Sequence, residues 1–278
     1  MALIFKPEFH QYQSIDPSEK IDWLGVTTFV SHFKQSFDPV KQATRSSNNV
    51  RSKWYGISPE EIQSIWKGEG DRSTTLGTWY HNQRESDIME FETMERHGVT
   101  VPIVKPIIIE GIKYAPDQKL QNGIYPEHLV YLKSAGICGQ SDRVEVVNRL
   151  VSISDYKTSK EIKLEGFTNW EGRTTKMLYT LDHLDDCHIV HYGLQLSLYL
   201  YMILKHNPQF IPGKLVIDHV IFEEEARDKY NYPIYKKDSS GNYVIKDLKH
   251  YPVPYYKSEV IAMINYLRDN RHLIKVKK

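Results

Sequence analysis

Residues 137–157, ICGQSDRVEVVNRLVSISDYK, contain two β-rich runs on either side of Asn148-Arg149. If these two residues form the turn of a hairpin, Val147 pairs with Leu150 and the numbers of paired residues sum to 297. Asp142 then lies directly opposite Asp155. Because side chains alternate between the two faces of a strand, both acids share a face with apolar residues of the same hairpin, namely Val144, Val146, Val151 and Ile153.

Two carboxylates that face each other on an apolar surface repel, because directly opposed residues have Cβ atoms about 5 Å apart. A divalent cation bound by Asp142 and Asp155 explains the arrangement, since hard cations prefer carboxylate oxygens. A register shifted by one residue would instead place both acids in solvent, and the sequence leaves that alternative open. Lys157 lies two residues beyond Asp155 and therefore on the same face, opposite Gln140.

This set of residues suits phosphodiester hydrolysis, which needs an activated water molecule and neutralisation of charge on the phosphate. Mg²⁺ or Mn²⁺ supplies both. A lysine beside the ion, here Lys157, can orient the water or help to deprotonate it, and it stabilises developing negative charge.

The order of predicted elements favours an α/β fold with a mixed central β-sheet flanked by helices. Apolar periodicity and turn residues predict helices over 26–33 with Thr27 as N-cap, from Ser58, over 76–97 with Gly98 as the stop, over 188–206 and over 258–274. They predict hairpins over 106–114 and 230–245, and strands over 128–132, 137–147, 150–157 and 215–222.

Charge and composition restrict the partners of the protein. The 278 residues carry 36 basic and 35 acidic side chains, a net charge of +1, so any DNA-binding face must be local. The polar and basic segment 38–57 is a candidate for DNA contact through Arg45, Arg51 and Lys53, and an ordinary solvated connection is the simpler alternative.

The two cysteines, Cys138 and Cys187, do not form a CxxC pair, which excludes a zinc site or a four-cysteine iron–sulfur cluster built from them. Free thiols are typical of a reducing compartment. The N-terminal residues have no signal-peptide core, and no run of about 18 apolar residues occurs. We therefore expect a cytoplasmic protein that does not enter a membrane.

Four short motifs resemble those of a known nuclease superfamily. Residues 154–158, Ser-Asp-Tyr-Lys-Thr, resemble the lysine strand of the PD-(D/E)XK nucleases, and residues 139–142, Gly-Gln-Ser-Asp, resemble the acidic motif that precedes it. Residues 77–81 resemble the helical histidine motif of the RecB-like branch, and residues 192–199 its Gln-x-x-x-Tyr motif. The whole is similar to the mitochondrial genome maintenance exonuclease group and its phage-encoded relatives, over roughly residues 25–205.

The resemblance implies a single PD-(D/E)XK nuclease domain over 1–278. Its restriction-endonuclease-like core would span about 70–225, with an N-terminal helical part over about 20–70 and a C-terminal hairpin and helix over about 226–278. It implies one or two Mg²⁺ or Mn²⁺ ions. The cluster-bearing members, such as the CRISPR-associated spacer-processing nucleases, use four cysteines, so no iron–sulfur cluster is expected here.

The resemblance also implies roles for individual residues. The metal ligands would be His81, Asp142, Asp155 and the carbonyl of Tyr156, and the catalytic residues would be Lys157, Asp142 and Asp155. In the later helix, Tyr192, Gln195 and Tyr199 form a polar stripe that would support the site or contact the DNA backbone, with a hydrogen-bonded core network as the alternative.

The sequence gives less support for a role of two further acids, Glu85 and Glu127. Glu85 lies on the same helical face as His81 and could support the site or a second ion. Glu127 could approach the site, but a solvated acid at a strand end is the simpler expectation.

The expected activity is that of a metal-dependent deoxyribonuclease, an exonuclease acting on DNA ends or single strands in replication, recombination or repair. It would act in the host cytoplasm if the gene is phage-encoded. An endonuclease of the same fold and a catalytically silent DNA-binding protein remain the alternatives, because a fold alone does not decide the reaction. The sequence does not decide the direction of digestion, the preference for single or double strands, the choice between DNA and RNA, or the oligomeric state.

Overall fold

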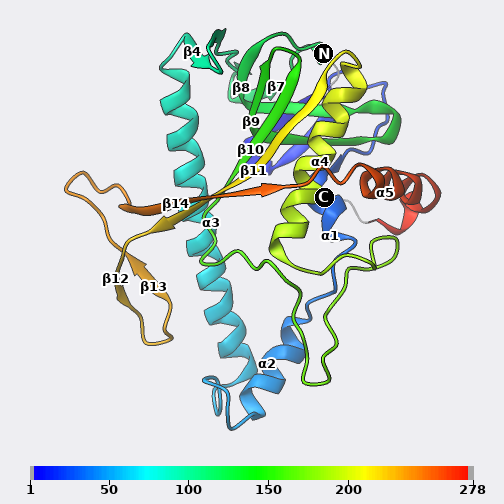
Figure 1. Cartoon of the computed structure of the whole chain (residues 1–278). Coiled ribbons are helices and arrows are strands. Elements are labelled where there is room, and N and C mark those ends of the chain that lie inside the picture. Colours follow the sequence, from blue (N-terminus) through cyan, green and yellow to red (C-terminus); the bar gives the residue numbers. More distant parts are fainter. Residues whose placement is uncertain (1–2, 275–278) are drawn as a thin grey trace.

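The central feature of the fold is a mixed sheet of six strands flanked by helices, as seen in a computed structural model that describes residues 3–274 (Figure 1). The strand order is β14 (Ile245–Val253), β11 (Ile211–Phe222), β10 (Leu150–Lys157) and β9 (Ile137–Val147). Both β8 (Gly123–Leu132) and β3 (Leu24–Gly25) pair with β9. The β10–β11 and β3–β9 pairs are parallel and the others antiparallel. The expected mixed α/β architecture is confirmed.

The register of the β9–β10 hairpin is the predicted one. Val147 pairs with Leu150, and the pairing continues to Arg143 opposite Ser154. Asn148 and Arg149 have φ angles of 49° and 70°. Two positive φ angles are those of a type I′ turn, whose twist matches that of the flanking strands. The alternative register, shifted by one residue, is wrong.

One edge of β9 is open in its middle. Strand β8 covers one edge from Ile137 to Val146. Because a strand has only two hydrogen-bonding edges, β10 and β3 must share the other. There β10 pairs only as far as Arg143, and β3 pairs with Ile137 and Cys138. Within the described chain, residues 139–142 therefore have no strand partner on that edge, so the acidic motif lies at a gap in the sheet.

Helices cover the two faces of the sheet. Alternation along β10 and β11 sends odd-numbered side chains to one face and even-numbered ones to the other. The helix α4 (His188–His206) belongs to the main core cluster together with Ile153 and Ile217. The long helix α3 (Pro59–Met89) packs Leu76 and Tyr80 with residues of the even-numbered face, namely Tyr156, Val220 and Phe222. Figure 1 shows α3 and α4 on different sides of the strands.

The helix α3 differs from its prediction. The start is confirmed, since the hydroxyl oxygen of Ser58 accepts a hydrogen bond from the Glu61 amide. The helix then continues without a break through Gly68 and Gly70, so a separate helix over 76–97 is wrong. It ends at Met89, and β4 (Thr93–Arg96) and β5 (Val99–Pro102) form a hairpin that turns at His97-Gly98. Gly98 serves this turn, where its φ is 73°.

The segment 38–57 is ordered and partly helical. The helix α2 (Pro39–Asn48) is capped by Asp38, whose carboxylate accepts a hydrogen bond from the Lys41 amide. Lys53 donates to the Tyr230 carbonyl and lies over the ring of Trp54, so it holds this segment against the later chain. The helix α1 (Val26–Ser31) begins at the predicted residue and ends two residues earlier than predicted, and Gly25 rather than Thr27 occupies its N-cap position.

The terminal parts contribute more to the sheets than expected. A second sheet of four strands joins β1 (Leu3–Lys6) and β2 (Gln11–Ser14) to β7 (Ile112–Tyr114) and β6 (Ile107–Ile109), so the N-terminal part is not purely helical. The strand β14 belongs to the central sheet, and α3 crosses position 70. The expected single domain, with a core over about 70–225, stays a prediction.

Other predicted elements are confirmed or adjusted. The helix over 188–206 and the hairpin over 106–114 are confirmed, whereas β8 and β11 begin earlier than expected. Residues 230–245 contain the predicted turn at Ser239-Ser240-Gly241, with an antiparallel bridge between Lys237 and Tyr243. The rest of the predicted hairpin is wrong, because β13 (Pro233–Tyr235) pairs with β12 (Glu224–Arg227). The last elements are α5 (Lys257–Asn270) and the 3-10 turn η3 (Arg271–Leu273); two more 3-10 turns are η1 (Pro7–Phe9) and η2 (Lys133–Ala135). Among residues 3–274, no helix has the length and apolar character needed to cross a bilayer.

Candidate active site

The gap beside β9 opens into a cleft of about 480 Å³. Of the residues singled out from the sequence, His81, Asp142, Asp155, Lys157, Gln195 and Tyr199 line this cleft, and so do the two acids with weaker expectations, Glu85 and Glu127. Tyr156 and Tyr192 do not line it. The structure therefore brings side chains from α3, β8, β9, β10 and α4 to one place.

Three potential metal-ligating groups meet in the cleft: His81 of α3, Glu127 of β8 and Asp142 of β9. One ligand atom from each lies within 4.8 Å of the others. Nδ1 of His81 is 3.3 Å from Oδ2 of Asp142. One nitrogen and two carboxylate oxygens form a donor set that suits a divalent cation such as Mg²⁺ or Mn²⁺.

The expectation for Glu127 was wrong. Its side chain is only 11% exposed, and the residue lies within β8 rather than at a strand end. The preceding Ile124 and Tyr125 are apolar and could have extended the predicted strand upstream. The obstacle is Pro126, because proline within a run of residues argues against a central strand.

Asp155 has different partners from Asp142. It is 1% exposed, and its carboxylate forms an ion pair with Lys157 and accepts a hydrogen bond of 3.1 Å from Nε2 of Gln195. The ammonium of Lys157 also lies 4.8 Å from the centre of the Tyr192 ring, a cation–π contact. Asp155 is thus placed to hold the lysine in the cleft, beside the group that contains Asp142.

The Gln195–Tyr199 pair supports the site from beneath. Nε2 of Gln195 donates to the hydroxyl of Tyr199 at 3.3 Å, and Tyr199 is only 3% exposed. Its ring lies against Gly139 of β9. These contacts correspond to the hydrogen-bonded core network that the sequence left open, whereas Tyr192 lies outside this network and contacts Lys157.

Tyr156 contacts the site through its backbone. Its amide donates a hydrogen bond of 2.7 Å to Oδ2 of Asp142, across the point where β10 leaves β9. Its side chain is buried with Tyr80 and Phe222, and its ring also packs edge-to-face against the ring of His81, with 6.0 Å between the ring centres. A ligand role for the Tyr156 carbonyl stays a prediction.

Charge interactions in the cleft shift several protonation equilibria. Burial, together with the charge of Asp142, raises the pKa of Glu127 to about 8 and that of Asp155 to about 6. Burial disfavours the charged form of His81, but the carboxylates of Asp142, Asp155 and Glu127 outweigh it and raise its pKa to about 9. Burial also disfavours the ammonium of Lys157, yet Asp155 and Asp142 raise its pKa.

The carboxylates of the cleft thus act on one another and on the two cations, and they raise the pKa values of His81 and Lys157. A divalent cation would replace the protons that His81 and Glu127 retain, because metal binding displaces protons from its ligands. In the described chain, the side-chain oxygen of Gln140 is also buried in this cleft without a hydrogen-bond partner. The residues present therefore fit a divalent cation.

A lysine from the second sheet completes the surroundings. Nζ of Lys113, on β7, lies 3.3 Å from Glu85 and 3.6 Å from Glu127. All three side chains are less than 15% exposed. Lys113 neutralises part of the negative charge and holds Glu85 beside the cleft.

Gly139 is the residue whose substitution tests how tightly the site is supported. A Cβ atom at this position would lie 2.6 Å from the buried ring of Tyr199, so Gly139→Ala must displace that ring and its hydrogen bond to Gln195. We expect a loss of about 1–3 kcal/mol in the free energy of unfolding, as for other overpacked core positions. Chemical denaturation measures this loss.

The matched control is Gly70→Ala in α3, where an added Cβ would meet no atom within 4 Å. This variant should gain up to about 1 kcal/mol, because alanine favours a helix over glycine. Equal stability of Gly139→Ala and the wild-type protein would show that Tyr199 does not brace β9.

Comparisons with known proteins do not assign a function to this chain. No family model matches the chain, and no curated protein matches it. The chain is similar to a solved structure entitled "Crystal structure of SSO0001", at 12% identity and a TM-score of 0.33, over 94% of this chain and 80% of that chain. A structural similarity of this size carries no argument about function.

Proposed function

We propose that this protein is a Mg²⁺- or Mn²⁺-dependent deoxyribonuclease with the restriction-endonuclease-like core of the PD-(D/E)XK superfamily, in its RecB-like branch. The observation that supports it most is the meeting of two sets of residues in one cleft. His81, Glu127 and Asp142 place their ligand atoms together, and beside them Lys157 is held by Asp155. Of the residues that the motifs singled out, His81, Asp142, Asp155, Lys157, Gln195 and Tyr199 line this cleft, whereas Tyr156 and Tyr192 do not.

The residues divide into those that hold the cation and those that act on the substrate. His81 and Asp142 would hold the ion, with Glu127 as a third donor that the motifs did not include. When bound, the ion supplies an activated water molecule and neutralises charge on the phosphate. Asp142 is itself oriented by the amide of Tyr156, which favours one carboxylate direction, as the partners of metal ligands commonly do.

Lys157 would act as a cationic donor to the phosphate or to the attacking water. Its pKa is raised by Asp155 and Asp142 against the effect of burial, so at neutral pH it carries a proton and cannot accept one. A fixed ammonium in a cleft that is partly shielded from water stabilises charge on the phosphate more than one in bulk water. Asp155 and Gln195 would keep it in place.

The preferred substrates are DNA ends or single strands, and the reaction would serve replication, recombination or repair. Hydrolysis adds one water molecule across a P–O bond and yields a phosphate monoester and a free hydroxyl. The test is incubation of the protein with end-labelled linear DNA, single- and double-stranded, and with circular DNA of the same length, with Mn²⁺ or with chelator.

Loss of linear DNA in Mn²⁺ only, with circular DNA intact, is expected for an exonuclease. Circular DNA cut as fast as linear DNA would make the protein an endonuclease of the same fold. DNA that is bound but never cut would overturn the proposal and leave the alternative of a DNA-binding protein.

A further inference from the structure

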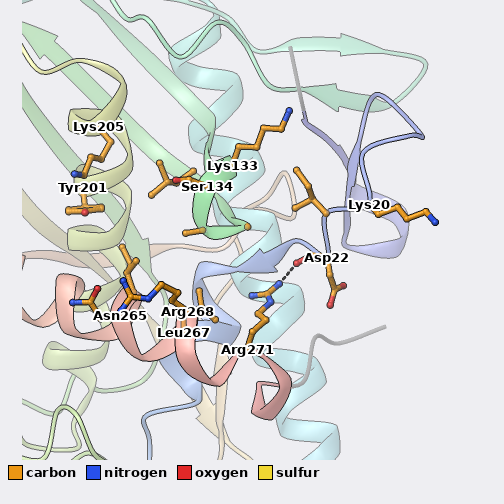
Figure 2. Close-up of a pocket in the computed structure, with 15 residues that line it drawn as sticks. Lys20, Asp22, Lys133, Ser134, Tyr201, Lys205, Asn265, Leu267, Arg268 and Arg271 are labelled. Carbon is orange, nitrogen blue, oxygen red and sulfur yellow. Dashed lines mark hydrogen bonds between the residues drawn. The ribbon is translucent and has the colours of Figure 1, made fainter.

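A second cavity, of about 610 Å³, has a strongly basic lining. It lies between α5, the C-terminal part of α4 and the turn η2 (Figure 2). Its only carboxylate among the described residues is that of Asp22, whereas the cationic side chains that line it are Lys20, Lys133, Lys205, Arg268 and Arg271. In a chain whose net charge is +1, this is a local concentration of positive charge.

Much of this charge is not neutralised by the protein. Lys133 pairs with Glu19, and Arg268 pairs with its neighbour Asp269. Over residues 3–274, no carboxylate forms an ion pair with Lys20, Lys205 or Arg271.

Nη2 of Arg271 donates a hydrogen bond to the main-chain carbonyl of Asp22, as the dashed line in Figure 2 shows. Nη1 of Arg271 is buried without a hydrogen-bond partner in the described chain. Figure 2 places Tyr201 and Lys205 on one side of Arg268, and Arg271 and Asp22 on the other. The cavity therefore suits an anion with several charges.

A third cavity, of about 270 Å³, lies next to both the basic cavity and the candidate active site. It shares Ile21 and Asp22 with the basic cavity, and His10, Tyr12 and Thr27 with the cleft that contains Asp142 and Lys157. The three cavities therefore lie side by side, each sharing wall residues with the next, in a row across β2, β3 and the start of α1 that we call the groove.

We propose that this groove carries a single DNA strand, with the basic cavity holding backbone phosphates several nucleotides away from the bond that is cut. The inference rests on the proposed function, to which it adds the strandedness and the footprint of the substrate. The middle of the groove is lined by the aromatic rings of His10 and Tyr12. Grooves that bind single strands combine aromatic rings, on which unpaired bases stack, with cationic side chains that contact the backbone.

The test measures binding rather than cleavage. The variant Lys205→Glu/Arg268→Glu reverses two exposed charges of the basic cavity, and the control Lys246→Glu/Lys249→Glu reverses two exposed charges on β14. The probes are fluorescent oligothymidines of about 5 and about 20 nucleotides, chosen to fill part or all of a groove of this kind. Fluorescence anisotropy is recorded with Ca²⁺, over a range of salt concentrations.

We expect the cavity variant to bind the longer probe about tenfold more weakly, with a salt slope lower by about 1.4, since each phosphate contact on a single strand contributes about 0.7. The short probe, held at the cleft, should bind equally well to both proteins, and the control variant should match the wild-type protein.

Unchanged affinity for the longer probe, or equal weakening for both lengths, would overturn the proposal. A third outcome would also overturn it: inorganic phosphate raises the melting temperature of the wild-type protein but not of the cavity variant, while both proteins bind DNA equally well. The cavity would then be a site for free phosphate. If these binding results hold but the wild-type protein cuts no DNA, the proposed nuclease activity fails and the groove stands. If the wild-type protein cuts DNA but the cavity variant binds the longer probe as tightly as the wild-type protein does, only the proposed role of the groove fails.

Discussion

Replacing Lys157 with methionine should lower the rate of DNA cleavage by about a thousandfold, the loss typical of removing one fixed donor from a site that stabilises developing negative charge. Lys157 is the cation held in the cleft by Asp155 and the ring of Tyr192. Methionine keeps much of the length of the side chain but cannot donate to phosphate or water. Because lysine does not bind the ion, the Mn²⁺ affinity measured by calorimetry should change little.

The Lys157→Met substitution also affects the stability of the fold. Methionine leaves the Asp155 carboxylate, which is 1% exposed, without its cation, and breaking a buried ion pair commonly costs about 3–5 kcal/mol. Lys157→Arg keeps the charge and should retain the fold while it loses much of the activity, since the guanidinium has a different donor geometry. Lys246→Met is the exposed control. Wild-type turnover in a folded Lys157→Met protein would remove the lysine from the mechanism.

Replacing Glu127 with glutamine should stabilise the metal-free protein at pH 8 by roughly 3–5 kcal/mol, because each pH unit between the pKa values of the unfolded and the folded chain disfavours the charged folded form by about 1.4 kcal/mol. Burial and the charges of Asp142 and Glu85 raise the pKa of Glu127 from 4.5 to about 8. The folded protein therefore keeps this proton until about pH 8, whereas the unfolded chain releases it near pH 4.5. Between these values the unfolded state binds fewer protons, so stability falls as the pH rises.

Glutamine removes this term, so its advantage should shrink as the pH falls towards 4.5. The variant should also lose most of the rise in melting temperature that Mn²⁺ gives the wild-type protein, because stabilisation by a ligand follows its affinity. Thermal unfolding with chelator and with Mn²⁺, at several pH values, measures both effects.

The control for this experiment is Glu145→Gln. Glu145 is also largely buried but is paired with Arg96 and Arg143 outside the cleft. Its loss should destabilise the protein and leave the Mn²⁺ effect unchanged. A Glu127→Gln protein that melts lower in chelator and keeps the full Mn²⁺ effect would place Glu127 outside the metal group.

The local sequence determined the hairpin on which the site is built. Asn148-Arg149 can adopt the two positive φ angles of the turn, and the alternation of apolar residues then leaves one register in which Val144 and Ile153 face the core. That register places Asp142, Asp155 and Lys157 in one cleft. The helix over 188–206 was equally predictable, because its apolar residues and the Asn207-Pro208 stop are contiguous in the chain.

Only the tertiary structure decided which acids join Asp142 and Asp155. Glu127 lies near His81 and Asp142 because β8 pairs with β9 on both sides of Pro126. Lys113 lies near Glu127 because β7, which carries it, pairs with β1 in the second sheet. The same holds for the groove, where Asp22 and Arg271 meet from opposite ends of the chain. Periodicity and turn residues act over a few positions, whereas these contacts join elements far apart in sequence, and their geometry is set by how the sheets and helices pack.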